Sequence, residues 1–488
     1  MRLKEIYFRL FCLFLIVGIS ESVGAQIPTI SIQTNEEIVD EPKIAGTFVY
    51  TGTDGEIISS TIGIEIRGGF SQTFPKKTYD IEFWSDASGS ETIDVQFGNL
   101  REDDDWVLDA MYNEPLRINS FITHKLWLDL NQLYYQDQEP KAKSGADVMY
   151  VTVTLNGEYQ GIYMLSEQVD RNLLKLKRNN GSEIRGELYK GYTWDDAVLF
   201  NDPDATPNNN SDTWSGYEYR YPDEIDWSNA FELIDFVANS SDEAFAAGIG
   251  NRFDMENIMD YFILLNVARI LDNRGKNIYL CRYDANEPYF FSPWDLDGSW
   301  GLLWNGQNAT VTTGAISNNL YDRLIENDVD DFVGRISQKW QDYRQTFLSD
   351  EALDNRINTA HQFLLDNAIY EAESEVWDYE YSDSDLDYLF NWLGKRIKFL
   401  DEYFDDITSV EQLSEDYNVS IHPNPAHNFI RITSDKNISS SVTIYNVLGQ
   451  MQKVEFMDSK RITIDINDLP SGAYVVKFNG VSKLFNKL

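Results

Sequence analysis

Residues 272–301, DNRGKNIYLCRYDANEPYFFSPWDLDGSWG, carry the most informative pattern in the chain. Two runs rich in aromatic and β-branched residues, 277–283 and 289–292, flank polar residues around Asn286, which predicts a β-hairpin turning near that asparagine. Apolar residues at helical spacing over 255–271 precede the stretch, so Asp272 begins a loop between a helix and a strand. The hairpin is therefore preceded by one polar loop and followed directly by another.

The loop before the hairpin has the residue spacing of a phosphoryl-transfer site. Asp272 and Asn277 lie five residues apart, and in such sites the aspartate accepts the proton of the attacking hydroxyl while the asparagine ligates a metal ion. Asp295, just after the hairpin, repeats the order in which a magnesium-binding aspartate follows the catalytic loop. Magnesium prefers hard oxygen ligands, which Asp295, Asn277 and Asp297 supply. A loop cap at Asp272 and an acidic turn over 293–301 are the structural alternatives.

A lysine in the N-terminal half is a candidate partner for this site. RGGFS at 67–71 is followed by PKKTYDIEF at 75–83, and strand alternation places Lys77 on the face of the apolar residues of that strand. Lys77 then points toward the core, where an ammonium group is costly unless an acid or a phosphate meets it. Glu167 is the expected acid. A strand-edge lysine that reaches solvent and a glutamate placed by a helix dipole are the alternatives.

The chain as a whole is predicted to be α+β. Alternating strand patterns dominate residues 28–165, with a hairpin-turn signal at Asn156-Gly157, and helical spacing dominates residues 230–404. A long polar loop is expected at 201–226. One domain over 26–405 thus has a β-rich first half and a helix-rich second half.

Two further segments flank this domain. Residues 1–25 have the basic start, apolar run and small residues of a secretory signal peptide, and no later stretch is long and apolar enough to make a transmembrane segment in the mature chain. After an acidic linker at 406–417, alternation over 418–488 predicts a small all-β sandwich. Cys281 is the one cysteine left in the mature chain, so no internal disulfide is expected.

Composition excludes several function classes. A formal net charge of −40 disfavours nucleic-acid binding, because phosphate backbones are repelled over most of such a surface. With 4 histidines in the chain, a histidine-based zinc site or a Ser-His-Asp triad lacks visible partners. Standard nucleotide-loop and hydrolase motifs are also missing from the sequence. Carboxylate-based chemistry remains.

Together these segments resemble the CotH kinase family. The resemblance covers roughly residues 40–405 and rests on RGGFS with PKKTYDIEF, LRINSF, NGEYQGIYMLSEQVDR, DNRGKNIYL and PWDLDGSWG, in that order. It implies an atypical kinase-like fold that binds ATP with Mg²⁺ or Mn²⁺. The implied catalytic residues are Asp272, Lys77 and Glu167, the implied nucleotide contacts are Lys77, Arg67 and Ser71, and the implied metal ligands are Asp295, Asn277 and Asp297. Unlike ordinary protein kinases, the chain has no His-Arg before Asp272 and no Phe-Gly after Asp295.

The tail resembles the type A sorting domains of the type IX secretion system. IHPNPA at 421–426, IYNVLGQ at 444–450 and LPSGAY at 469–474 carry the resemblance. It implies a Bacteroidota source, handling by the type IX secretion machinery, and passage through the periplasm to the medium or the outer-membrane surface. An ordinary adhesive β module is the alternative.

Two functions follow as expectations. The first is a secreted or surface protein kinase that transfers phosphate from ATP to Ser or Thr of an extracytoplasmic protein, or to itself. The second is a catalytically inactive surface protein with the same fold that binds a metal, a glycan or a protein partner. Aromatic residues that could stack on sugars in this second case are Tyr192, Trp194, Trp214, Tyr217 and Tyr219.

Overall fold

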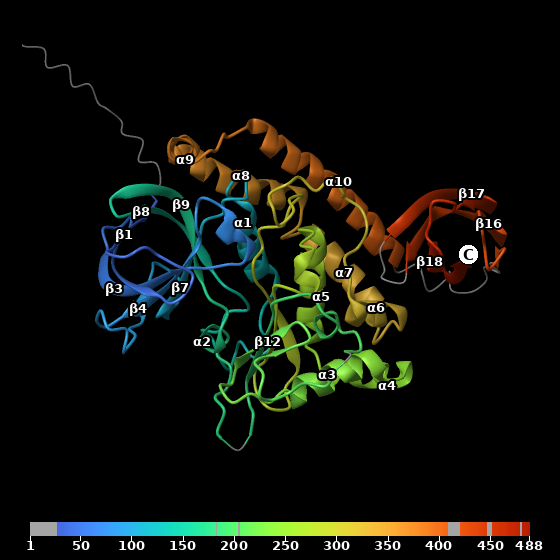
Figure 1. Cartoon of the computed structure of the whole chain (residues 1–488), viewed down its shortest axis with the longest axis horizontal. Helices are drawn as coiled ribbons and strands as arrows, with labels where there is room; N and C mark the ends of the chain where they lie inside the picture. Colours follow the sequence, from blue (N-terminus) through green and yellow to red (C-terminus); the bar gives the residue numbers. More distant parts are fainter. Residues whose placement is uncertain (1–26, 182, 204, 408–419, 447–450, 479–480) are drawn as a thin grey trace, which may run out of the picture.

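The computed structural model describes residues 27–407 apart from 182 and 204, and residues 420–488 apart from 447–450 and 479–480 (Figure 1). The predicted signal peptide 1–25 lies outside the described residues. So does most of the predicted linker 406–417, except that residues 406 and 407 belong to the last turn of helix α10 (Asp383–Ile407). None of the described helices combines the length and the apolar character that crossing a bilayer requires.

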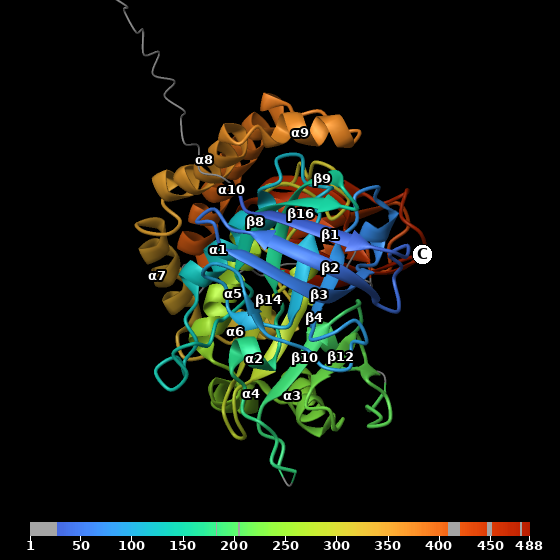
Figure 2. The same cartoon turned by 90° about the vertical axis from the view of Figure 1, so that its left-hand side faces the viewer.

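A closed β barrel forms the first half of the chain (Figures 1 and 2). In barrel order its strands are β1 (Thr29–Thr34), β2 (Ile44–Thr51), β3 (Ile57–Ile66), β4 (Tyr79–Trp84), β7 (Asp105–Asp109), β9 (Glu158–Glu167) and β8 (Val148–Leu155). Alternate residues such as Ile62, Ile64 and Ile81 point inward and are fully buried, which gives the barrel its own core. The predicted Asn156-Gly157 turn joins β8 to β9, and both residues have the positive φ that this turn needs.

Helices dominate the second half, as predicted. They are α3 (Ser228–Asn239), α4 (Asp242–Gly248), α5 (Met255–Val267), α6 (Asn319–Glu326), α7 (Phe332–Arg344), α8 (Asp350–Asp366), α9 (Ile369–Val376) and α10. Helix α1 (Asn119–Leu130) and the short α2 (Arg171–Leu174) come earlier, and β5 (Val95–Gln96) pairs with β6 (Glu102–Asp103). Helix α5 is buried almost throughout, and α9 packs against β9 of the barrel (Figure 1). The α+β class is therefore confirmed.

A five-stranded sheet inside the second half carries the hairpin predicted near Asn286. Its order is β11 (Thr213–Trp214), β12 (Tyr217–Tyr221), β10 (Glu187–Gly191), β13 (Ile278–Arg282) and β14 (Tyr289–Pro293). The prediction of a loop over 201–226 is wrong in part, because β11 and β12 lie within it. Their aromatic residues Trp214, Tyr217 and Tyr219 are buried against the rest of the domain, and this packing outweighs the polar composition around them.

Residues 420–488 form a separate all-β domain beyond the end of α10 (Figure 1). Its strands are β15 (Ser420–His422), β16 (Phe429–Asn446), β17 (Met451–Asp465), β18 (Gly472–Phe478) and β19 (Val481–Lys487), connected as one hydrogen-bonded sheet. The long strand β16 pairs with β15 near its start and with β18 near its end, with a register shift between Thr433 and Ile438. This domain has its own core, which includes Ile430, Ile444 and Val476.

Candidate functional site

A cavity of about 560 Å³ lies between the barrel and the second half. Its walls come from the β3–β4 connection, the ends of β7, β9 and β10, helix α1, and the loops that flank the β13–β14 hairpin. Most of the predicted site residues line it: Arg67, Ser71, Asp272, Asn277, Asp295 and Asp297. Segments that are more than two hundred residues apart in the sequence therefore meet at one cavity.

The β13–β14 hairpin brings the two polar loops together. Strand pairing places Ile278 opposite Pro293, and the amide of Trp294 donates to the carbonyl of Asn277 at 3.0 Å. The side chains of Asn277 and Asp295 then meet, with Nδ2 of Asn277 donating to Oδ2 of Asp295 at 3.0 Å. Both residues have left-handed backbones, with φ of 57° and 55°, a conformation that costs about 1–2 kcal/mol and must be held by its surroundings.

Asn273 is one of the residues that hold this arrangement, and sequence reasoning did not assign it a role. Its buried Nδ2 donates to the carbonyls of Asn277 at 2.8 Å and of Trp294 at 2.7 Å. It therefore fixes both loops at once. The neighbouring Asp272 remains accessible, with 26% of its side chain exposed and Lys276 Nζ at 3.4 Å from Oδ2.

Buried carboxylates gather on the same wall. Burial raises the pKa of Asp295, with Lys190 and Lys276 acting in the opposite direction, and burial together with the charge of Asp295 raises the pKa of Asp297 well above its ordinary value. Asn113 Nδ2 donates to Oδ2 of Asp297 at 2.5 Å. Nearby negative charges that are withdrawn from water favour protonation unless a cation joins them.

Asp109, at the end of β7, belongs to this group although no pattern in the sequence indicated it. It lines the cavity and accepts hydrogen bonds from the amide of Met111 at 3.0 Å and from Oγ1 of Thr78 at 3.4 Å. Burial raises its pKa, and the charge of Asp295 adds to the effect. The barrel therefore contributes a carboxylate of its own to the cavity.

Cations face these carboxylates. Arg67 pairs with Asp80 at 2.8 Å and lies over the ring of Trp294 at 5.4 Å. Burial, together with the nearby charge of Arg67, lowers the pKa of Lys190 to about 8. Lys76 and Lys276 also line the cavity. These basic residues equal in number the four aspartates that line the cavity, so its wall combines both signs of charge.

The prediction that Lys77 points inward and pairs with Glu167 is wrong. Strand β4 begins only at Tyr79, so its alternation does not extend back to Lys77, whose Nζ donates to the carbonyls of Gln72 at 2.7 Å and of Phe74 at 2.5 Å. Glu167 is buried and pairs with Lys143 Nζ at 2.6 Å. Neither residue lines the cavity.

Lys76 occupies the inward position instead. It is 1% exposed, and its Nζ pairs with Oε1 of Glu373 on α9 at 2.8 Å. Burial lowers the pKa of Lys76 to about 8, an effect that the charge of Glu373 opposes. The acid that meets the inward lysine thus comes from the helical half, not from the barrel.

Glu373 joins the two halves through further bonds. Its Oε2 accepts from Arg117 Nε at 3.2 Å and Nη2 at 3.1 Å, and its Oε1 accepts from the amide of Ile162 at 2.8 Å. Gly161 makes room for it, since a Cβ at that position would lie 1.8 Å from Oε1 of Glu373. The carboxylate is fully buried and surrounded by donors from three separate segments.

The β3–β4 connection covers one side of the cavity. Gly68 has a φ of 103°, and a Cβ there would lie 2.0 Å from Oγ of Ser71, so glycine is required for this turn. Phe70 extends from the turn to Trp304, with ring centroids 4.6 Å apart in an edge-to-face contact. Both rings line the cavity and are about half exposed, which places them at its mouth.

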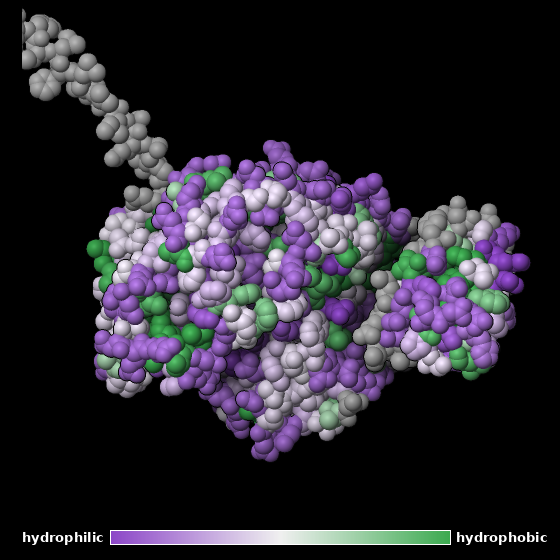
Figure 3. All heavy atoms as spheres, turned by 45° about the horizontal axis from the view of Figure 1, so that its top comes forward, coloured by the Kyte–Doolittle hydropathy of each residue, from purple (hydrophilic) through white to green (hydrophobic). Residues whose placement is uncertain are grey.

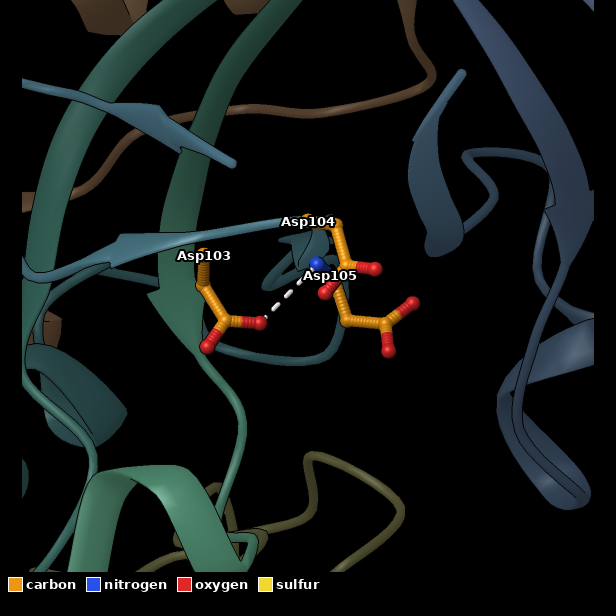
Figure 4. Close-up of side chains that lie close together, drawn as sticks. All are labelled: Asp103, Asp104 and Asp105. Carbon is orange, nitrogen blue, oxygen red and sulfur yellow. Dashed lines mark hydrogen bonds between the residues drawn. The ribbon is translucent and has the colours of Figure 1, made fainter. Parts of the chain in front are cut away.

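A second acidic group, Asp103, Asp104 and Asp105, lies outside this cavity (Figure 4). Among the described residues it is the group of three whose ligand atoms lie within 4.8 Å of one another, whereas the cavity aspartates are more widely spaced. Asp103 already pairs with Arg101 at 2.9 Å and accepts from the amide of Asp105 at 3.1 Å. Local hydrogen bonds and one arginine account for this group.

Comparisons with known proteins agree with the sequence resemblance. The family model described as CotH kinase protein matches residues 64–400, and the one described as secretion system C-terminal sorting domain matches residues 420–488. No curated protein matches the chain. Since the first match spans most of the chain, including every residue of the cavity, the chain belongs to the CotH kinase protein family and ends in a secretion system sorting domain.

Proposed function

We propose that this protein is a secreted kinase that transfers the γ-phosphate of ATP to Ser or Thr hydroxyls of an extracytoplasmic protein or of another copy of itself. The observation that carries the proposal is the convergence of Asp272, Asn277 and Asp295 on one cation-lined cavity. Family membership supports the same reaction class. A kinase-like relation of the barrel to the helical half is part of this proposal.

The donor set of the cavity fits a divalent cation. Asp295 and Asn277 offer carboxylate and amide oxygens, and Oδ1 of Asp295 accepts no hydrogen bond from the part of the chain that the structure describes. Buried carboxylates with raised pKa values are the groups whose charge a cation would compensate. Magnesium or manganese bound there would neutralise charge on the transferring phosphate.

The chain's own residues divide the remaining work. Asp272, accessible at the cavity wall, accepts the proton of the attacking hydroxyl. Arg67, Lys190 and Lys276 bind phosphate oxygens through charge-assisted hydrogen bonds. The apolar side chains of Val107, Met164 and Trp294 line the same cavity and offer a surface for a nucleobase.

Lys76 and Glu373 take the role that the sequence assigned to Lys77 and Glu167. A lysine held by a buried glutamate is a recurring part of phosphoryl-transfer sites, where it orients the phosphates. Lys76 reaches the cavity, and its partner anchors it from the other half of the domain. Arg67 and Ser71 remain candidate nucleotide contacts, because both line the cavity.

Export is the second part of the proposal. The sorting domain indicates handling by the type IX secretion machinery and delivery to the outer-membrane surface or the medium. The visible face of the molecule is mostly hydrophilic, with apolar side chains in smaller patches, as expected for a protein that meets water (Figure 3). ATP would then have to reach the protein in the periplasm, or another phosphoryl donor would have to replace it.

Thermal unfolding of the signal-free chain tests nucleotide binding. ATP with Mg²⁺ or Mn²⁺ should raise the melting temperature, because a ligand at about 100 times its Kd stabilises the native state by about 2.7 kcal/mol. Asp295→Asn should lose the metal-dependent part of the rise. Asp104→Asn, outside the cavity, is the matched control and should keep it.

Transfer itself is tested with labelled ATP and total surface protein. Asp272→Asn should keep the nucleotide-dependent rise in melting temperature and lose labelling. Equal labelling by this variant would refute the role of Asp272. If neither nucleotide nor metal shifts unfolding, a binding protein without turnover becomes the better interpretation. Of the aromatic residues expected to bind sugars in that case, Tyr192 and Trp194 are exposed.

A further inference from the structure

Helix α10 holds the segment that follows the cavity aspartates. Three side chains spaced four residues apart on one face of the helix donate to backbone carbonyls of residues 301–314, named here the α10-bound segment. Tyr388 donates to Gly301 and Ala309, both at 2.9 Å, and Trp392 donates to Val311 at 3.2 Å. Arg396 Nη1 donates to Thr312 at 3.2 Å and to Gly314 at 2.9 Å. The segment is therefore fixed along its length.

Arg396 is a buried cation whose hydrogen bonds go to neutral groups. It is 0% exposed, and besides the segment it bonds to Asn266, through Nε to the backbone oxygen at 2.8 Å and through Nη2 to Oδ1 at 3.1 Å. Burial, together with the charge of Arg269, lowers its pKa to about 9. Asn266, to which Arg396 bonds, stands three residues before Arg269, so the end of helix α5 brings the two arginines near each other.

Arg269 has no hydrogen-bond or ion-pair partner among the residues that the structure describes. It follows the end of α5 with a φ of 54°, and its Nε is buried without a hydrogen bond. Across the described residues, none of its guanidinium nitrogens is hydrogen-bonded or ion-paired, and Arg396 forms no ion pair with a carboxylate. The amide of Trp300 donates to the carbonyl of Ala268 at 2.8 Å, so Arg269 is adjacent to the start of the α10-bound segment.

Such a pair is unexpected in this chain. Acidic residues number 80 against 40 basic ones, yet no carboxylate compensates these two partly desolvated cations within the described structure. Withdrawing cations from water without an opposite charge is costly. The two arginines are therefore arranged as an anion-binding site, whose anion must come from a group other than the carboxylates of the described residues.

Hydroxyl groups that could carry the anion lie on the same segment. Thr313 is exposed and stands between the two residues, Thr312 and Gly314, whose carbonyls Arg396 holds. Neither threonine hydroxyl makes a hydrogen bond to the described residues. A phosphate ester brings about two negative charges and three acceptor oxygens, which a guanidinium such as that of Arg269 binds in a bidentate manner. Arg396 already donates four of its five N–H groups, so it has one left for the ester.

We propose that Arg269 and Arg396 form a binding site for a phosphate monoester on Thr312 or Thr313, which a second copy of this chain places there. The transfer step rests on the proposed kinase function, whereas the anion site does not. Since the two threonines do not line the cavity, transfer is assigned to another molecule. The threonine oxygen forms a bond to the γ-phosphorus of ATP as the β–γ bridging bond breaks, ADP leaves, and Asp272 of the donor copy takes the hydroxyl proton.

The first experiment needs no ATP. Thr312→Glu and Thr313→Glu are introduced singly into the signal-free chain with and without Arg269→Gln, and the melting temperatures are compared as a double-mutant cycle. At least one glutamate should raise the melting temperature by about 2 °C, and Arg269→Gln should abolish the rise. Thr310→Glu, on the same segment, is the control and should show no Arg269-dependent rise. A rise that survives Arg269→Gln, or no rise with either glutamate, overturns the anion site.

The second experiment tests the transfer. The wild-type chain is incubated with ATP and Mg²⁺ and with a mass-tagged Asp295→Asn copy, and phosphate on the tagged copy is located by peptide mass spectrometry. Phosphate on Thr312 or Thr313 supports the proposal. Phosphate on other residues or other proteins alone overturns the assigned acceptor and leaves the kinase function standing. No transfer to any acceptor contradicts both the kinase function and the transfer step, while the glutamate cycle still decides the anion site.

Discussion

Replacing Glu373 by glutamine should strongly destabilise the domain. The carboxylate accepts from Lys76, Arg117 and the amide of Ile162, and both cations are 1% exposed. Glutamine keeps one acceptor oxygen, but its amide group donates and would lie next to Lys76 or Arg117. It also leaves the positive charges of both residues without compensation. Removing one member of a buried ion pair costs about 3–5 kcal/mol, and we expect a loss of about 4 kcal/mol.

Urea unfolding followed by tryptophan fluorescence measures this loss. The 12 tryptophans all lie between Trp84 and Trp392, so the signal reports on the domain that contains Glu373 and not on residues 420–488. Glu375→Gln, on the exposed side of the same helix, is the control and should change the free energy of unfolding by less than about 0.5 kcal/mol. Lys76→Met should cost less in the Glu373→Gln background than in the wild type, because the two residues interact directly.

A loss below about 1 kcal/mol for Glu373→Gln would refute the reasoning, since it would mean that Lys76 and Arg117 do not depend on this carboxylate. Equal costs of Lys76→Met in both backgrounds would refute it as well. Either result would also weaken the assignment of Lys76 and Glu373 as the lysine–glutamate pair of the site.

Two further predictions concern the cavity wall. Burial lowers the pKa of His124 from 6.5 to about 4. Between pH 6.5 and pH 4 the unfolded chain therefore binds more protons at this residue than the native protein does. The stability that neutral His124 contributes is lost as pH falls through this range. The free energy of unfolding of the wild type, measured relative to that of His124→Phe, should therefore drop by about 3 kcal/mol between pH 7 and pH 4. If the two proteins lose the same free energy of unfolding over this pH range in urea, the prediction is contradicted. Asp297→Asn removes one of several mutually repelling carboxylates. It should raise the melting temperature of the metal-free protein by about 2 °C and reduce the further rise with ATP and Mg²⁺, and a lower melting temperature without metal would count against the repulsion.

The sequence predicted the part of the site that is local in the chain. Asn277 and Asp295 meet because a short hairpin with an identifiable turn lies between them, and such turns leave a clear pattern in the residues. The same holds for the barrel hairpin at Asn156-Gly157. Alternation also identified the inward face of β4 correctly from Tyr79 onward.

The remaining contacts of the site depend on tertiary packing, and they have no recognisable pattern in the sequence. Lys76 finds its acid 297 positions away on a helix whose own sequence shows no functional signal. Extending strand alternation back to Lys77 failed because the chain turns before Tyr79, and the local turn decides which lysine points inward. Asp109 was missed because an acidic residue at a strand end is common in this acidic chain, and only the fold shows that it faces Asp295.

The parallel pairing of β1 with β8 has a consequence for how the nascent chain must be handled. Strands β1 to β4 are synthesised well before β7, β8 and β9, so until residue 167 has been made they form an incomplete sheet with two open edges. Unpaired strand edges are templates for association with other chains. When β7 joins β4, β8 joins β1, and β9 pairs with both β7 and β8, the barrel closes and both edges disappear. Truncated products that end before β8 should therefore aggregate, even though they contain several well-formed antiparallel pairs.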